Sequence, residues 1–374
     1  MSSTKARTPW GTPPWTIVAR ANAKRVPRDV DFAVVGGGFT GLAAAACLRR
    51  LAPGRTVAVF EAARLGAGSS GHTGGLALGE TAAGDLPGLG DVLGGVQRIL
   101  SGLRVECDLD LRGVYELAHG ARDTPSPIQW HDGQPLRVVK AVSGGSIDPG
   151  KLVSGLARAA IRLGAKVYEH APVEHIAFER PLRLKVRGQT VRAKRALVAT
   201  NAMSLELSGL AGRAQPKFTM AAMTEELSSE QIAALGLHSR MPFYTIDLPY
   251  LWGRFLGQRL VLGSGLVHLN EWSELRSVDV AAGEAAELIA RLQRRARSLH
   301  PALNGVSFTH AWGGPILIAG EWKPVFARHP QSPDVLVLGA YSGHGVALSV
   351  YLGSWAGEVM LGRKRLPKWG AMPG

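Results

Sequence analysis

The chain has 374 residues, 46% of them hydrophobic and 19% charged, a globular composition that excludes a disordered protein. Its formal net charge of +14 comes from basic residues scattered along the chain, so nucleic acid is not expected as a partner. The two cysteines exclude a disulfide framework and a zinc cluster, and no apolar run reaches the ~18 residues of a membrane span. We therefore expect a cytoplasmic protein with no metal and no membrane anchor, whose oligomeric state stays open.

The chain begins with a polar, proline-bearing arm over residues 1–28, in which Trp10 and Trp15 could pack on the body or cover a neighbouring subunit. A short apolar strand over 31–35 follows and runs directly into a glycine-rich turn. An alanine-rich helix and a second strand over 56–60 come next, and Glu61 stands at the end of that strand.

The turn has the spacing Gly36-x-Gly38-x-x-Gly41, between a strand and a helix. In that context the glycines permit a tight turn and close approach to a pyrophosphate, which the helix N-terminus attracts. Glu61 is placed to accept hydrogen bonds from a ribose diol. These features predict a bound dinucleotide. A structural glycine turn in an unrelated α/β fold is the competing interpretation, and it leaves Glu61 unexplained.

Farther along, small residues fill 66–79, which indicates a loop shaped by close contact with a ligand. Helices are predicted near 84–103, 148–163, 280–297 and 346–360, and strands near 167–168, 182–186, 196–199, 260–262 and 335–338. Alternating strands and helices predict an α/β fold.

Four segments in a fixed order carry a more specific resemblance. They are Arg64-Leu-Gly-Ala-Gly-Ser-Ser-Gly-His-Thr-Gly-Gly75, Ile147-Asp-Pro-Gly-Lys-Leu-Val153, Leu197-Val-Ala-Thr-Asn-Ala202 and Gly339-Ala-Tyr-Ser-Gly-His-Gly-Val-Ala-Leu348. In this order they resemble the D-amino-acid oxidase-like (DAO) family of FAD-dependent oxidoreductases. Within that family, the chain looks most like the gamma-glutamylputrescine oxidase-type amine oxidoreductases.

The resemblance implies an α/β fold with a discontinuous Rossmann-type FAD-binding domain over 29–82, 143–215 and 326–374. It also implies an inserted antiparallel-sheet α+β substrate domain over 83–142 and 216–325. The residues expected to contact FAD are Gly36, Gly38, Phe39, Thr40, Gly41, Glu61, Ala62, Arg64, Ser69, Ser70, His72, Thr73, Gly74, Gly75, Val173, Thr200, Asn201, Gly313, Gly343, His344, Gly345 and Val346.

The sequence departs from the family pattern before the last strand. Many members have Asp-Gly-x-Pro there, whereas this chain has Glu321-Trp-Lys-Pro324, which puts the local geometry in doubt. His72 matches the spacing of a histidine that is joined covalently to flavin in the dimethylglycine-dehydrogenase branch. Non-covalent FAD is the favoured prediction, with a covalent link through His72 as the alternative.

The candidate catalytic residues lie in two places. His344 stands between two glycines in the expected flavin-facing turn, and Lys323 could help dioxygen accept an electron. Tyr250, Trp252 and Arg254 alternate, so on one strand they would share a face that receives the substrate. Helix capping, an ordinary surface lysine and core packing are the respective competing interpretations.

The expected reaction is oxidation of the C–N bond of a small amine or amino acid by hydride transfer to FAD, followed by hydrolysis of the imine. Dioxygen is the expected electron acceptor, and a dehydrogenase with another acceptor is the alternative. Two other hypotheses are a flavin-containing binding or assembly subunit without turnover and an NAD(H)-dependent dehydrogenase. The second leaves the loop after Glu61 and the turn over 339–346 unexplained.

Overall fold

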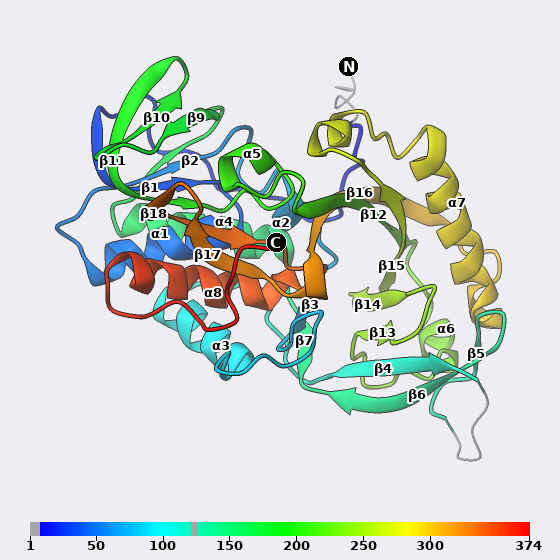
Figure 1. Ribbon diagram of the computed structural model, residues 1–374. Helices are drawn as coiled ribbons and strands as arrows, with labels where there is room; N and C mark the ends of the chain where they lie inside the picture. The colour runs from blue at the N-terminus through cyan, green and yellow to red at the C-terminus, as the bar shows by residue number, and fades with distance from the viewer. Residues whose placement is uncertain (1–7, 121–125) are drawn as a thin grey trace, which may run out of the picture.

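The computed structural model describes residues 8–120 and 126–374, which form two sheet-based halves side by side (Figure 1). One half contains an eight-stranded sheet with the path β17-β18-β11-β1-β2-β8, to which β10 and β9 are added beside β11. The other contains an eight-stranded sheet in the order β16-β12-β15-β14-β13-β4-β6-β5. No helix in the described part of the chain is long and apolar enough to cross a membrane.

The strands of the first sheet are β1 (Asp29–Val35), β2 (Val57–Phe60), β8 (Lys166–Tyr168), β9 (Val173–Ala177), β10 (Leu182–Val186), β11 (Gln189–Val198), β17 (Val325–His329) and β18 (Ser332–Gly339). Parallel pairing joins β8, β2, β1, β11 and β18. Strand β17 is antiparallel to β18 at one edge. This arrangement confirms the predicted α/β fold with a Rossmann-type parallel sheet.

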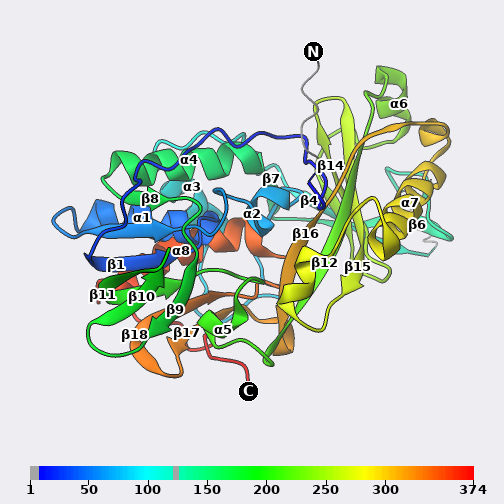
Figure 2. The same cartoon turned by 90° about the horizontal axis from the view of Figure 1, so that it is seen from above.

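Helices cover one face of this sheet, as Figure 2 shows from above. They are α1 (Phe39–Leu51), α3 (Val92–Gly102), α4 (Pro149–Arg162) and α8 (Gly345–Met360). Alternation along β1 explains the layering, because Val34 packs toward these helices while Ala33 and Val35 face the hairpin of β9 and β10. Helix α8 is apolar on all sides and lies against α1, where a Cβ on Gly353 would stand 2.5 Å from the Thr40 carbonyl oxygen.

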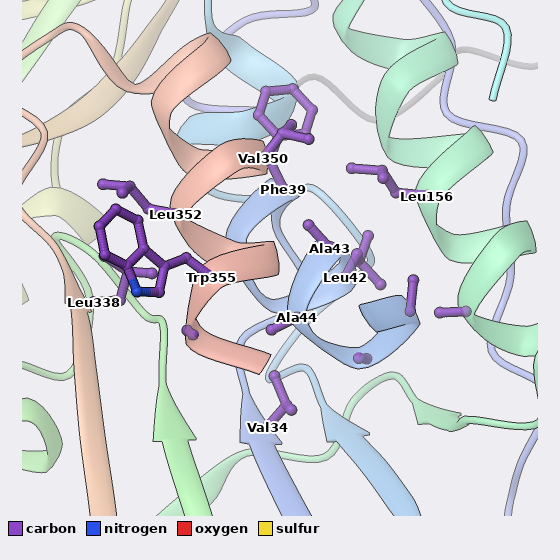
Figure 3. Packing of buried hydrophobic residues seen from close by; sticks show 14 of the residues in the cluster. Val34, Phe39, Leu42, Ala43, Ala44, Leu156, Leu338, Val350, Leu352 and Trp355 are labelled. Atoms are coloured by element: carbon purple, nitrogen blue, oxygen red, sulfur yellow. The ribbon is translucent and has the colours of Figure 1, made fainter. Parts of the chain in front are cut away.

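Figure 3 shows how this layer is filled. Leu42 and Ala43 of α1 meet Leu156 of α4, and Trp355 of α8 lies near Leu338 of β18. Helix α3 starts at Val92 rather than near residue 84, because Asp91 caps it by accepting a hydrogen bond from the Gly94 N–H at 2.8 Å. Helix α3 packs in this core and not on the second sheet, although it lies inside the segment 83–142 that is expected to belong to the substrate domain.

The second sheet contains β4 (Val114–His119), β5 (Trp130–His131), β6 (Pro135–Val142), β12 (Ala214–Thr224), β13 (Phe243–Thr245), β14 (Trp252–Leu256), β15 (Arg259–His268) and β16 (Phe308–Ala319). All of its pairings are antiparallel except that of β13 with β4. Helices α6 (Ser229–Ala234) and α7 (Gly283–Ser298) cover its outer face.

The remaining elements are short. They are α2 (Ser69–His72), β3 (Leu76–Leu78), β7 (Gly144–Ser146), α5 (Leu205–Ser208), η1 (Trp272–Arg276), η2 (Pro301–Leu303) and η3 (Gly320–Trp322). Strands β3 and β7 pair antiparallel at the junction of the two halves. The division into an FAD-binding domain and a substrate domain stays a proposal.

Candidate active site

The turn between β1 and α1 forms a cradle for an anion. Helix α1 begins after Gly38 with no side-chain cap and no acidic residue in its first turn, which leaves N–H groups and the positive end of the helix dipole available. A Cβ on Gly41 would stand 2.1 Å from the Gly36 carbonyl oxygen, so only glycine permits this close packing. The Phe39 N–H donates to Ser70 Oγ at 3.0 Å, which brings the flavin loop (residues 66–75) against the helix start.

Glu61 lies at the end of β2, beside this cradle. Its carboxylate accepts hydrogen bonds from the Gly37 N–H at 2.7 Å and from the Ala63 N–H at 2.9 Å. Burial raises the pKa of Glu61, against the lowering effect of these bonds. The Ala171 N–H donates to the Glu61 carbonyl oxygen at 2.8 Å, which brings the start of β9 at Val173 near the same strand end. The neighbouring Ala62 and Arg64 are exposed.

Hydrogen bonds connect the flavin loop to two other family segments. Ser69 Oγ donates to the Pro315 carbonyl oxygen at 2.6 Å and accepts from Asn201 Nδ2 at 3.0 Å. Asn201 Oδ1 in turn accepts from the Ala340 N–H at 2.9 Å. Thr200 Oγ1 is buried and has no hydrogen-bond partner within residues 8–120 and 126–374. Segments far apart in sequence therefore meet at one place, with an unpaired hydroxyl among them.

His72 ends α2 and is held from both sides. Its Nδ1 lies 3.0 Å from the Gly68 carbonyl oxygen, a bond in which an Nδ1–H donates. Burial lowers its pKa, so the imidazole is neutral at neutral pH. The Trp10 ring meets it edge-on, with centroids 5.4 Å apart. On the other side, a Cβ on Gly314 would stand 2.7 Å from His72 Cβ, next to Gly313.

The turn before α8 forms the opposite wall. His344 is the N-cap residue of α8 without capping through its side chain, and its Nδ1 lies 3.5 Å from the Ser342 carbonyl oxygen. Burial lowers the pKa of His344, against the smaller raising effects of that carbonyl and of Glu80. Gly343 is exposed with φ +91°, and a Cβ there would meet nothing within 4 Å. The turn is tied to α1 by Thr40 Oγ1, which lies 2.8 Å from the Tyr341 hydroxyl.

On the substrate side, strand register aligns side chains across the sheet into one row, which we call the sheet row. Cross-strand pairing links Trp312, Ala221, Gly263, Trp252, Tyr244, Glu116 and Lys140 in this order. Residues paired in this way share one face of a sheet. The opposite face is the one that packs under α6 and α7. The sheet row therefore faces the half that contains the first sheet, which we call the flavin half.

Near its far end, the sheet row brings Tyr244 and Glu116 beside a second carboxylate, that of Glu80. Tyr244 Oη lies 2.7 Å from Glu116 Oε1 and 3.2 Å from Glu80 Oε1, and Glu80 comes from the loop after β3 in the flavin half. Glu116 is 8% exposed, and its other oxygen lies 3.3 Å from Lys140 Nζ. Burial and the hydrogen bond to Glu116 raise the pKa of Tyr244. One hydroxyl proton serves two carboxylates and the Lys140 cation offsets one of them, so one negative charge remains here for a cationic group.

Two of the three substrate candidates after residue 249 lie on one strand as expected, and the third does not. Only Trp252 and Arg254 lie on β14, because Tyr250 precedes the strand and places its hydroxyl 2.7 Å from Thr219 Oγ1. The Trp252 ring fills the space over Gly74, where a Cβ would stand 2.0 Å from Cη2. Arg254 is buried beneath the flavin loop, where its Nε donates to the Gly74 carbonyl oxygen.

Lys323 is 40% exposed and pairs with Glu321, with Nζ and Oε2 2.5 Å apart. The departure from the family pattern is visible in the backbone, since Glu321 has φ 58° and Trp322 has φ 60°. This left-handed region favours glycine, and Trp322 occupies it with a side chain that is 52% exposed.

Sequence reasoning missed Glu80, Glu116 and Tyr244 on the substrate side, and it missed Trp312. They lie on separate elements: strand register aligns Trp312, Tyr244 and Glu116, and the loop after β3 brings Glu80 to them from the other half. No local motif carries that information.

These features fit a flavin dinucleotide. The uncapped helix start suits a pyrophosphate, and Glu61 lies where a ribose would bind. Loop 66–75 and the turn before α8 leave room beside Gly343, and the buried Thr200 hydroxyl lacks a partner among the described residues. The loop and the turn would hold the ring system, and Gly343 and Gly345 permit its close approach.

Comparison with known proteins agrees with this geometry. The family model described as "FAD dependent oxidoreductase" (DAO) matches residues 31–359. The chain is 27% identical to the probable oxidoreductase OrdL of Rhizobium meliloti, over 90% of this chain and 84% of that protein. It is 26% identical to the gamma-glutamylputrescine oxidoreductase of Escherichia coli, over 89% and 84% of the two chains.

Among solved structures, glycine oxidase from Geobacillus kaustophilus has the same fold, with a TM-score of 0.71 and 20% identity over 91% of this chain and 96% of that one. The family match covers most of the chain. The chain therefore belongs to the DAO family of FAD-dependent oxidoreductases.

Proposed function

We propose that this protein oxidises the C–N bond of a small amine or amino acid. The observation that carries the proposal is the sheet row, which runs along the flavin-facing side of the second sheet and brings Tyr244 and Glu116 beside Glu80. Aromatic side chains suit an alkyl chain or a cation, and buried carboxylates suit an ammonium group. Relatives named for glycine and for gamma-glutamylputrescine support the same substrate class.

FAD, when bound, supplies a two-electron acceptor for hydride from the carbon beside the nitrogen. The protein's own residues bind and orient the amine. Glu80 and Glu116, with the Tyr244 hydroxyl between them, attract the ammonium form and hold it near His344.

Oxidation requires the amine nitrogen to lose its proton. His344 suits this role because burial lowers its pKa, so its neutral imidazole has a nitrogen lone pair available at neutral pH. Loss of hydride then gives an imine, and water hydrolyses the imine to a carbonyl compound and a free amine or ammonia.

Dioxygen is the proposed electron acceptor, giving hydrogen peroxide. Lys323 lies shortly before β17, whose partner β18 leads into the turn of His344, and its cation would favour electron transfer to dioxygen. A dehydrogenase with another acceptor is the alternative. We propose non-covalent FAD, with His72 as a neutral neighbour. A covalent link through His72 is the alternative, because the Nδ1–H bond to the Gly68 carbonyl leaves Nε2 unprotonated.

A panel of small amines tests the proposal. Matched compounds with one amino group, with two amino groups and with an added carboxylate would be compared for peroxide release and for reduction of an artificial dye. We expect the highest kcat/KM for compounds with a second cationic group, because the carboxylates of Glu80 and Glu116 flank the Tyr244 hydroxyl. Turnover of none of these compounds with either acceptor would contradict the proposal.

A further inference from the structure

The only helix in the flavin loop is the four-residue α2, and the Gly66 and Gly68 carbonyl oxygens are bonded within the loop. Other carbonyl oxygens of the loop accept hydrogen bonds from distant parts of the chain. Three buried side chains supply N–H donors to them. The pairs are Trp15 Nε1 with the Gly71 carbonyl at 2.7 Å, Trp312 Nε1 with the His72 carbonyl at 3.0 Å, and Arg254 Nε with the Gly74 carbonyl at 2.5 Å.

The three donors also contact one another, although they come from the arm, β16 and β14. The rings of Trp15 and Trp312 meet edge to face with centroids 5.4 Å apart, and Arg254 Cζ lies 5.8 Å from the centroid of the Trp15 ring. Their exposed fractions are 9%, 0% and 4%. They form one connected layer behind the loop, which we call the donor layer.

The arm is fixed on both sides of Trp15, so its indole has a defined position. Before it, the Trp10 carbonyl oxygen accepts from the Gly313 N–H at 2.9 Å. After it, the Val18 N–H donates to Ser154 Oγ at 3.0 Å. The arm is therefore hydrogen-bonded to both halves of the molecule, and it supplies one of the donors to the loop.

Burial lowers the pKa of Arg254 to about 10, which leaves its guanidinium protonated and able to donate at neutral pH. Its Nη2 has no hydrogen-bond partner in the described part of the chain, and it would lie 3.2 Å from a Cβ on Gly75. Arg254 thus donates through Nε to the loop from beneath, and its Nη2 also lies next to the loop.

We propose that Trp15, Trp312 and Arg254 are positioning residues for FAD. They fix the carbonyls of loop 66–75 from behind, so the N-terminal arm determines how tightly the cofactor is held. The proposal rests on the family's cofactor and not on the amine reaction.

The test replaces single N–H donors while keeping an aromatic ring. Trp15→Phe and Trp312→Phe each remove one hydrogen bond to the loop. Trp130→Phe is the matched control, because Trp130 is also buried and its Nε1 donates to the Leu235 carbonyl at 2.9 Å, far from the loop in the core under the second sheet. The Kd for FAD would be measured by fluorescence titration of each apoprotein, with its thermal midpoint recorded alongside.

We expect Trp15→Phe and Trp312→Phe to raise the Kd for FAD about tenfold, the effect of one lost buried hydrogen bond. We expect Trp130→Phe to lower the thermal midpoint as much as the two loop variants do, because it also removes one buried hydrogen bond. Its Kd for FAD should stay within about twofold of that of the unsubstituted protein. The visible circular dichroism of bound flavin should change only in the two loop variants.

Two results would overturn the inference. One is an unchanged Kd in both loop variants, and the other is an equal rise in Trp130→Phe, which would indicate general destabilisation. Failure of the unsubstituted protein to bind FAD would instead contradict FAD as the cofactor. Failure of the positioning role and failure of the cofactor assignment are therefore distinguishable.

Discussion

The two walls of the site are built by different means. The flavin wall depends on backbone groups, namely the N–H groups at the start of α1, the turn before α8 and the glycines that permit close approach. The substrate wall depends on side chains that cross-strand register brings into one row. The comparison shows that a cofactor site can follow from short local motifs, whereas a substrate site needs the pairing of strands that are far apart in sequence.

The largest effect is expected on the flavin wall. Gly41→Ala would force a Cβ to within 2.1 Å of the Gly36 carbonyl oxygen, so α1 must shift away from the turn. We expect a loss of about 3 kcal/mol in unfolding free energy and over ~100-fold in FAD affinity. Gly54→Ala is the control, since its Cβ would meet nothing within 4 Å. Equal FAD binding by both variants would show that close packing at Gly41 is not needed.

On the substrate wall, Glu116→Gln tests the negative charge of the Glu116 carboxylate in the sheet row. A buried carboxylate that binds an ammonium group contributes about 1.5–3 kcal/mol, so we expect KM for cationic amines to rise roughly 10- to 100-fold. The Kd for FAD should not change. Glu226→Gln is the control, because Glu226 lies in the same half, 69% exposed and paired with Arg259. A normal KM in Glu116→Gln would remove this carboxylate from substrate recognition.

Glu61→Gln tests the carboxylate of the flavin wall, and we expect a smaller effect from it. The neutral amide weakens bonds with the Gly37 N–H and with a ribose diol, so we expect FAD affinity to fall about tenfold. KM for the amine, measured with saturating FAD, should stay the same. Glu174→Gln, an exposed residue of β9, should leave both constants unchanged. An effect of Glu61→Gln on KM alone would reverse the assignment of the walls.

The smallest effect concerns a network that supports the substrate wall. His119 Nδ1 lies 2.8 Å from Asp247 Oδ1, its Nε2 lies 3.0 Å from Asp132 Oδ2, and Arg295 also pairs with Asp132 at 2.6 Å. Burial alone would lower the pKa of His119, but the hydrogen bonds to both carboxylates outweigh it and raise the pKa.

The stabilisation from His119 is therefore complete below the ordinary histidine pKa of ~6.5 and is lost as pH rises through the raised value. We expect unfolding free energy to fall by about 1 kcal/mol over that range, measured by denaturant titration at a series of pH values. His119→Gln should flatten this slope. A variant that keeps the slope would place its origin in another group.

Most of the flavin half could be predicted from sequence. The glycine spacing, the acid at the end of the second strand and the four ordered family segments are local patterns, and each marks a turn or strand end that the structure shows. The predicted start of helix α3 near residue 84 is about two turns too early, because a cap at Asp91 outweighs the apolar residues before it.

The substrate wall could not be predicted in the same way. Tyr250, Trp252 and Arg254 alternate in sequence, yet Tyr250 precedes β14 and Arg254 lies beneath the flavin loop. Glu80 and Glu116 meet at Tyr244 only because β4 pairs with β13 and the loop after β3 reaches the sheet from the other half. Such contacts depend on register and domain packing, which no local pattern records.

Anaerobic titration of the purified protein with small amines, followed through the visible flavin absorption band, tests the central claim most directly. We predict that the protein carries FAD and that a cationic amine bleaches the band in proportion to the amine added. A stable flavin band with every amine tested would contradict an amine oxidoreductase and would favour a flavin-containing binding subunit. Absence of any flavin, even after FAD is added, would contradict the cofactor site itself.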